Sequence, residues 1–335
     1  LLFFQMQGGQ GAAGLPADAR DAAARELYEL LLGPAAHEVR AARTLVLLPD
    51  GLLHRLPFAL LRDGPRCLVE ERELFVAPSL RTLRDLRSRA RARQREAAAP
   101  RLAMLAVGCE GGAEADTASA ADAAGGGAGL ARTAGGAAAQ ATGRVLPFTG
   151  APVPRLREAA AEAAEAASRF PGALVLTGAA ADEASFKRAP LADARIVHVA
   201  AHGIADPLDV RRSLLVLNPA PAGPRADSPD STAGALEDGV LQWHEAVALP
   251  LRASLVTLSS CQSAGGVLAR GEGVTGLTQA FLHAGATCVL AAQSGVPDRS
   301  ARRLMQDFYR ELRAGRTAAA ALREAQRQAL ARPAD

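Results

Sequence analysis

Short apolar runs alternate with longer stretches of helix-forming residues along most of this sequence. The apolar runs fall at residues 44–48, 102–107, 173–176, 195–200, 254–259 and 286–292. Strands that are separated by helices pair in parallel, because the crossover connection returns the chain to the same end of the sheet. The sequence therefore predicts an α/β fold, a three-layer sandwich in which helices cover a mainly parallel sheet.

The segments between these runs are rich in alanine, leucine and arginine. We predict helices at 18–42 with a break at Gly33-Pro34, at 79–95 with Ser79 as the cap, and at 155–168, 182–188, 241–248, 273–284, 299–313 and 317–331. Residues 66–78 are predicted as a strand or a strand pair, and 213–217 as a further strand. Aromatic residues make up only 4% of the chain, so aliphatic side chains must fill the core.

Two segments lack the apolar residues that a packed element needs. Residues 110–143 are almost wholly Gly, Ala, Thr and a few acids, and residues 219–239 form a Pro-rich loop. Such segments bury too little apolar surface to offset the entropy of ordering, so we predict that they are mobile and dispensable for folding. We divide the chain into an N-terminal half, residues 1–99, and a second half, residues 100–335, which contains both segments.

Positive and negative charges are nearly balanced along the chain. The formal net charge is +3, which gives no indication of a nucleic-acid surface. The densest charge block is RDLRSRARARQR at residues 84–95. We interpret it as a solvated helix face followed by a linker, with an acidic partner as the alternative.

The cysteines and the lengths of the apolar runs indicate in which cellular compartment the protein is expected. Cys67, Cys109, Cys261 and Cys288 lack the spacing of a disulfide framework or a structural zinc site, which favours a reducing cytoplasm. No apolar run reaches the roughly 20 residues that a membrane helix needs, so we expect no membrane association. Because the first residue is Leu1 and not Met, we expect the chain to be part of a longer polypeptide.

Two of the predicted strands lead into residues with reactive side chains. The strand at 195–200 runs into Ala201-His202-Gly203, and the strand at 254–259 runs into Ser260-Cys261. Active sites of open α/β sheets form at the carboxyl ends of parallel strands. We therefore expect His202 and Cys261 to face one another across a crevice.

A histidine beside a cysteine is suited to nucleophilic catalysis. The imidazole favours the reactive thiolate and can afterwards protonate a leaving amine. The backbone N–H groups of Gly203 and Cys261 could bind the oxyanion that develops on the attacked carbonyl. Each residue alone also has an ordinary explanation, since a cysteine is often a small buried hydrophobe and a loop histidine often only a hydrogen-bonding group. The residue pattern by itself leaves both explanations open.

Successive motifs along the chain resemble those of the CHAT family of caspase-like peptidases. In order, they are LVLLPDGLLHRLPFALL, LFVAPSLRTL, IVHVAAHG, SLLVLNP, LVTLSSCQSAGG, GEGVTGLTQAFLHAGATCVLAA, GVPDRSARRLMQDFYREL and AALREAQ, and together they span about residues 18–331. The resemblance implies a fold related to caspases and separases, with a non-catalytic N-terminal half. It also implies a cysteine endopeptidase that uses His202 and Cys261 and needs no metal or organic cofactor.

The same resemblance implies a protein substrate, and either an activating partner or a fused helical-repeat module. One departure from the family pattern concerns the pocket. The family usually carries a tryptophan just before the Val-Pro-Asp motif, which is Val296-Pro297-Asp298 here, and this chain has small or polar residues instead. The departure motivates a first alternative, a catalytically silent interaction or scaffold domain that keeps the fold.

Two acidic residues are candidates for a substrate pocket. Glu272 and Asp298 both follow the strand that leads to Cys261, so they could reach a pocket beside it. We therefore predict a preference for a basic side chain just before the cleaved bond. Either residue could instead cap a helix.

Two further alternatives use other chemistry. A different thiol enzyme, an acyltransferase or a redox protein on a doubly wound sheet, would need the same cysteine. His198 and His202 have the i, i+4 spacing of a zinc protease, but that motif requires a helix and a glutamate directly after the first histidine, where this chain has Val199. We predict no metal site.

Overall fold

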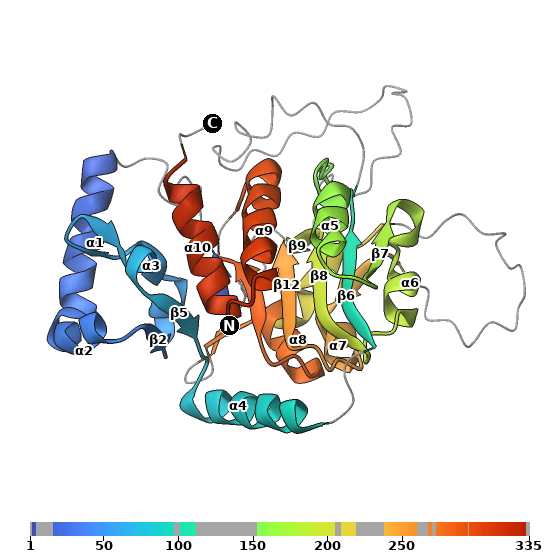
Figure 1. Cartoon of the computed structure of the whole chain (residues 1–335), viewed down its shortest axis with the longest axis horizontal. Coiled ribbons are helices and arrows are strands. Elements are labelled where there is room, and N and C mark those ends of the chain that lie inside the picture. Colours follow the sequence, from blue (N-terminus) through green and yellow to red (C-terminus); the bar gives the residue numbers. More distant parts are fainter. Residues whose placement is uncertain are drawn as a thin grey trace, which may run out of the picture.

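In the computed structural model, helices cover both faces of a parallel sheet (Figure 1). The described residues are 2–4, 16–96, 101–111, 153–204, 209–218, 238–259, 267–269, 273–293 and 295–332. The sequence predicts that residues 110–143 and 219–239 are mobile. Nearly all of these residues lie outside the described ranges, so their mobility stays a prediction.

A six-stranded sheet forms the centre of the molecule. Its order is β1-β15-β12-β8-β6-β7, and every neighbouring pair is parallel. The strands are β1 Leu2–Phe4, β6 Leu102–Gly108, β7 Leu174–Thr177, β8 Ala194–Ala200, β12 Leu255–Ser259 and β15 Val289–Ala292. The sequence analysis missed only β1, whose three residues are too short to show a pattern. The predicted fold class is confirmed.

The strands are apolar on both sides because both sides are covered. In β8, Val197 and Val199 belong to one buried cluster while Ile196 belongs to the other, as expected from the alternation of side chains along a strand. The first cluster lies under α6 Glu183–Arg188, α7 Trp243–Ala248 and α8 Leu277–Ala284. The second lies under α5 Ala159–Ser168, α9 Asp298–Arg313 and α10 Ala318–Leu330. The result is a three-layer α/β/α sandwich.

Helix α5 lies unusually close to β6. A Cβ at Gly108 would come within 2.5 Å of the carbonyl oxygen of Ala159, so only glycine allows this approach. The buried face of α5 consists largely of alanines, including Ala163 and Ala166, which keeps the helix close to the sheet. The residues that precede α5 are thereby brought to the carboxyl end of the sheet.

The N-terminal elements form a smaller unit beside this sandwich. They are α1 Ala17–Leu31, η2 Gly33–Ala35, α2 Ala36–Ala41, β2 Thr44–Leu47, η3 Gly51–Arg55, η4 Phe58–Leu60, β3 Arg62–Asp63, β4 Arg66–Cys67, α3 Leu68–Glu71 and β5 Glu73–Val76. The next helix, α4 Leu80–Arg95, packs on the sandwich instead, where Leu86 contacts the first cluster. Strands β2 and β5 pair in parallel, and Tyr28, Phe58 and Leu68 contribute to a small core of their own. Arg323 of α10 donates to the carbonyl oxygen of Glu70 at 2.6 Å, which ties this unit to the sandwich.

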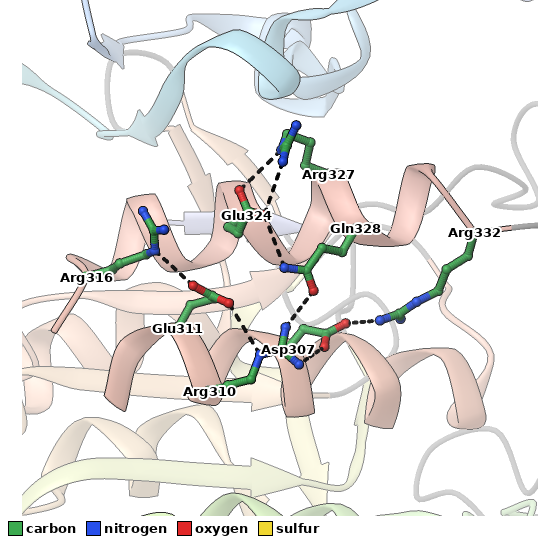
Figure 2. A network of polar contacts seen from close by, with 8 residues as sticks. All are labelled: Asp307, Arg310, Glu311, Arg316, Glu324, Arg327, Gln328 and Arg332. Atoms are coloured by element: carbon green, nitrogen blue, oxygen red, sulfur yellow. Dashed lines mark hydrogen bonds and ion pairs between the residues drawn. The ribbon is translucent and has the colours of Figure 1, made fainter. Parts of the chain in front are cut away.

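A polar network joins α9 to α10 on their outer side (Figure 2). Arg310 donates to Gln328 at 2.6 Å across the helix pair, and Arg332 pairs with Asp307. The arginines are partly exposed, but the Asp307 carboxylate that they pair is buried. Loss of either arginine would weaken the compensation of a buried charge. The apolar contacts of Phe308 and Leu322 lie beneath this network.

Several sequence predictions need correction at element boundaries. The helix expected at 155–168 begins at Ala159, and the strand expected at 286–292 begins at Val289. Residues 66–78 are not one strand or a simple strand pair, because α3 lies between β4 and β5. The Glu70 carboxylate accepts from the Cys67 N–H at 2.6 Å and stabilises this turn of helix. The helices expected at 241–248 and 273–284 begin later. Their first residues instead form β11 Val240–Gln242 and β14 Gly273–Thr275, which pair with β10 Leu214–Val216 and β13 Val267–Ala269.

Within the described ranges, no helix combines the length and the apolar character that crossing a bilayer requires.

Candidate active site

His202 lies directly beyond the carboxyl end of β8. After Ala201 the chain enters the short strand β9, His202–Ile204, which pairs in antiparallel register with β10. In this register His202 lies opposite Val216 and Gly203 opposite Leu215. The position of the histidine at a strand end agrees with the sequence prediction, and its side chain is half-buried.

The imidazole of His202 is oriented by a backbone carbonyl. Its Nε2 atom lies 2.7 Å from the carbonyl oxygen of Pro154. A carbonyl oxygen only accepts, so Nε2 must carry the proton of a neutral ring. The lone pair is then on Nδ1. The histidine is thus in the tautomer that can accept a proton at Nδ1.

The pKa of His202 is lowered from its ordinary value, chiefly because burial disfavours the charged imidazolium. The hydrogen bond to Pro154 acts in the opposite direction and offsets part of this effect. At neutral pH the ring is therefore neutral and available as a base.

The loop that carries Pro154 is fixed against the end of β6. The N–H of Leu156 donates to the carbonyl oxygen of Glu110 at 2.7 Å, and Arg155 forms an ion pair with the Glu110 carboxylate at 2.6 Å. Gly111 and Arg155 also form an isolated antiparallel bridge. These contacts keep the Pro154 carbonyl in place beside the histidine.

Gly111 completes the backbone around His202. Its φ of +72° lies in the left-handed region, and a Cβ there would lie 3.4 Å from the imidazole Cδ2 and 3.2 Å from the Pro154 oxygen. The Gly111 N–H donates to Asn218 Oδ1 at 3.3 Å, while Asn218 Nδ2 donates to the carbonyl oxygen of Gly178 at 2.8 Å. Asn218 therefore links the β6, β7 and β10 ends behind the histidine.

A small cavity opens beside His202 at the carboxyl end of the sheet. Its lining residues are Leu156, Ala159, Glu162, Ala200, Ala201, His202, Ser259, Val296, Asp298 and Ala301. Ser259 is the last residue of β12 and pairs in register with Ala200. Its buried hydroxyl has no hydrogen-bond partner among the described residues. A buried hydroxyl without a partner is costly, so this atom favours a polar occupant such as water.

Asp298 lines the same cavity, but its carboxylate is engaged. It is the first residue of α9, and its Oδ2 accepts from the N–H of Glu158 at 2.7 Å, just before α5 begins. Burial raises the pKa of Asp298, and the nearby Glu162 and Glu158 raise it further, while its backbone hydrogen bonds lower it. Asp298 thus lies beside the cavity, and it accepts from a backbone N–H at the start of α5 without capping its own helix α9.

A buried polar chain runs beneath the cavity. The hydroxyl of Tyr309 donates to Thr257 Oγ1 at 2.9 Å, and its oxygen lies 3.0 Å from His198 Nδ1. His198 Nε2 lies 3.2 Å from Glu162 Oε1, although the two atoms form no hydrogen bond. All four side chains are almost fully buried, and burial raises the pKa of Tyr309. Glu162 also lines the cavity, so these buried polar groups extend from the core of the sandwich to the site.

Cys261 and Glu272 lie outside the described residues. Among the described cysteines, Cys67 and Cys288 are free thiols, and Cys67 and Cys109 are buried. Burial raises the pKa of Cys67 and of Cys288. A thiol with a raised pKa carries little thiolate at neutral pH, so these two side chains are poor nucleophiles.

His198 and His202 both lie on strands and not on one helix, so they lack the geometry of the zinc-protease motif. Among the residues that the structure describes, no group of three or more His, Cys, Asp or Glu side chains could hold a metal ion.

Sequence reasoning did not identify Pro154, Asn218 or Ser259 as parts of the site. Asn218 and Ser259 each stand at the end of an apolar run. A polar residue directly after a buried strand could have indicated that these two residues belong to the site. Pro154 acts through its backbone carbonyl, so its side chain carried no signal at all.

Comparison with known proteins adds two findings. The family model described as CHAT domain matches residues 21–335. A stretch of 77 residues is 44% identical to the mouse (Mus musculus) Tetratricopeptide repeat protein 28, which corresponds to 23% of this chain and 3% of the mouse protein. The chain thus covers only a small part of that relative's length.

Proposed function

This chain belongs to the CHAT domain family, whose fold is caspase-like, and on that basis we propose that it is a cysteine endopeptidase with His202 as general base and acid and Cys261 as nucleophile. The observation that carries the proposal is the state of His202. Its ring is held through Nε2 by the Pro154 carbonyl at the end of β8, which leaves Nδ1 free to take up a proton.

Covalent geometry supports the choice of Cys261. Ser259 lines the cavity beside His202, and consecutive Cα atoms are about 3.8 Å apart. Any residue two positions beyond Ser259 is therefore within about 7.6 Å of the Ser259 Cα. Cys67 and Cys288, whose raised pKa values disfavour the thiolate, are weaker candidates.

In the proposed reaction, Nδ1 of His202 takes the proton of the Cys261 thiol, and the thiolate attacks the scissile carbonyl carbon. The backbone N–H groups of Gly203 and Cys261 stabilise the oxyanion. As the C–N bond breaks, the imidazolium gives its proton to the leaving amine, and a thioester remains on Cys261. Water then attacks the thioester, and His202 accepts the water proton and returns it to the thiol.

The acidic residues beside the site support a basic substrate. We propose that Asp298, together with Glu272, favours Arg or Lys just before the cleaved bond. The Asp298 carboxylate lines the cavity that His202 lines, and Glu162 adds a second carboxylate there. Opposite charge in a desolvated site favours a cationic side chain.

The partners and the organisation of the protein also belong to this proposal. The similarity to a tetratricopeptide repeat protein supports a helical-repeat module, fused or separate, as the element that gates cleavage. We propose residues 1–99 as the non-catalytic half and 100–335 as the catalytic half. The free thiols of Cys67 and Cys288 support a reducing, cytoplasmic location.

The decisive experiment combines covalent labelling with peptide cleavage. A peptidyl electrophile that alkylates thiols should label the parent and the Cys288→Ala control but not Cys261→Ala. His202→Ala should lose cleavage by about 10²–10⁴-fold, the usual contribution of a general acid–base group. Cleavage by Cys261→Ala at the parental rate would refute the proposed pair.

A silent scaffold domain is the alternative, and one observation favours it. The residues before Val296-Pro297 lack the family's tryptophan, and Gln293 instead donates to the carbonyl oxygen of His54 at 3.3 Å. A properly folded parent protein that is neither labelled nor active, with and without a helical-repeat partner, would support the scaffold.

A further inference from the structure

Helix α4 uses one of its faces to hold the sandwich. Arg89 donates to the carbonyl oxygen of Leu282 at 2.8 Å, while Arg93 donates to those of Ala253 at 3.0 Å and Gly285 at 2.6 Å. These carbonyls lie at the end of α8 and just before β12. Arg89 and Arg93, the inward-facing arginines of α4, therefore hold this helix against the sandwich.

The opposite face of α4 carries four further arginines that the fold does not use. Arg84, Arg87, Arg91 and Arg95 are exposed, and they lie with Ser88 and Ala92 on one face of the helix. We call these four residues the outer arginine row. Among the described residues, none of the four has an ion-pair partner.

The spacing of the row is unfavourable for an isolated solvated helix. Side chains three or four positions apart are neighbours on a helix, and like charges there repel. Arg84 and Arg87, Arg87 and Arg91, and Arg91 and Arg95 are such pairs. No acidic residue stands three or four positions from any of them within α4. Asp85 lies off the row, so the usual alternation of charge on a solvated face is missing.

We propose that the outer arginine row is a docking site for an acidic polypeptide helix that presents Asp or Glu every three or four residues along one face. The row extends over about 16 Å, or three helical turns. A helix laid along it would bring a carboxylate to each guanidinium, and guanidinium groups bind carboxylates through two parallel hydrogen bonds.

Two other kinds of polyanion fit this surface less well. Helix α4 has no aromatic residue on which a base could stack, and the chain carries a net charge of only +3, so it lacks the broad basic field of a nucleic-acid surface. Between the arginines this face presents only Ser88 and Ala92, whose side chains are too small to insert into a membrane.

The proposed docking site is remote from the candidate active site. Helix α4 contacts the residues that lead into β12, whereas His202 follows the carboxyl end of β8, which runs parallel to β12 (Figure 1). A helix bound to the row thus occupies the opposite end of the sheet. The proposal does not depend on peptidase activity.

The test uses two synthetic alanine-based peptides of identical composition. One carries four Glu residues spaced three, four and four apart on a single helix face, and the other carries them scrambled around the helix. We expect the matched peptide to bind the whole chain at least about tenfold more tightly than the scrambled one, as four exposed charge pairs allow. The variant R84Q/R87Q/R91Q/R95Q should lose this preference.

The control variant R25Q/R66Q/R101Q/R195Q removes the same charge from exposed arginines elsewhere and should retain it. A second measurement uses the unaltered chain, so it does not depend on a variant folding well. When the matched peptide is added, hydrogen exchange of the backbone amides of residues 80–95 should slow. Three results would overturn the proposal. The first is equal binding of both peptides, and the second is a row variant that keeps the preference. The third is tighter binding of a single-stranded RNA oligonucleotide or a phosphatidylserine vesicle than of the matched peptide.

Discussion

His202 Nε2 donates a hydrogen bond to the carbonyl oxygen of Pro154 across 2.7 Å, although 48 positions separate the two residues in the chain. The carbonyl fixes both the tautomer and the direction of the imidazole. A proline contributes this contact through its backbone alone, so substitution of its side chain leaves the acceptor in place. The properties of His202 and of its surroundings lead to four predictions.

The first prediction concerns the pH dependence of cleavage. Burial lowers the pKa of His202 below its ordinary value of 6.5, so the neutral base persists to lower pH than in a free histidine. We expect the acidic limb of the kcat/KM profile for a peptide substrate to have its midpoint below pH 6.5. A midpoint at or above that value would contradict a neutral, buried base.

The same shift affects stability with a definite sign. The unfolded chain binds the proton of His202 more readily than the folded chain does, so folding stability rises with pH in this range. The contribution is complete above pH 6.5 and is lost as the pH falls through the lowered folded-state pKa. Urea unfolding of the parent and His202→Gln across this range isolates the effect.

The second prediction uses two glycines with similar positive φ values. Gly111 and Gly64 have φ values of +72° and +76°, so alanine at either position should cost about 1 kcal/mol in backbone strain. Only at Gly111 would the new Cβ come close to His202. We expect Gly111→Ala to impair cleavage strongly while Gly64→Ala leaves it unchanged. Gly111→Ala should also lose more thermal stability, because only its Cβ meets neighbouring atoms. Equal activity of the two variants would show that the Gly111 contact is unimportant.

The third prediction concerns the buried polar chain. Tyr309→Phe removes the hydroxyl that bridges Thr257 and His198, and it leaves both of these buried side chains without that partner. We expect a loss of about 1–3 kcal/mol in the free energy of unfolding. In the double variant with Thr257→Val the loss should be smaller than the sum of the single losses, because both changes delete one hydrogen bond. Strict additivity in urea unfolding would argue against the coupling.

The fourth prediction separates the two uses of Asp298. Asp298→Asn keeps an oxygen that can accept from the Glu158 N–H, whereas Asp298→Ala leaves that N–H unpaired and should cost about 1 kcal/mol. If the carboxylate recognises a basic substrate, both variants should lose the preference for Arg and Lys in a peptide library. A preference that survives in the Asn variant would assign Asp298 to capping alone.

Asp298 also has a pH dependence of opposite sign to that of His202. Its raised pKa means that the folded chain holds the proton more tightly than the unfolded chain, so the contribution of Asp298 to stability falls as the pH rises through the folded-state pKa. Asp298→Asn should therefore gain stability relative to the parent between pH 4 and pH 7. Thermal melting at both values measures the change.

Local patterns in the sequence were sufficient to predict most of the elements. Ser79 caps α4 through the Thr82 N–H, and Asp182 caps α6 through the Ser185 N–H, both across only three positions. Apolar runs predicted the central strands for the same reason, since side-chain alternation and capping act between near neighbours in the chain. The helix α3 was missed because tertiary packing and a Glu70 cap outweighed the strand-like composition of its surroundings.

The sequence by itself thus determined the fold class, the family motifs and the place of His202 at the end of an apolar strand. Only the tertiary structure decided what surrounds that histidine. The Pro154 carbonyl, the Asp298 contact with Glu158 and the Tyr309 bridge to Thr257 join positions 48, 140 and 52 residues apart. Such contacts depend on strand order and on how closely α5 approaches β6, and neither is encoded in the periodicity of any one segment.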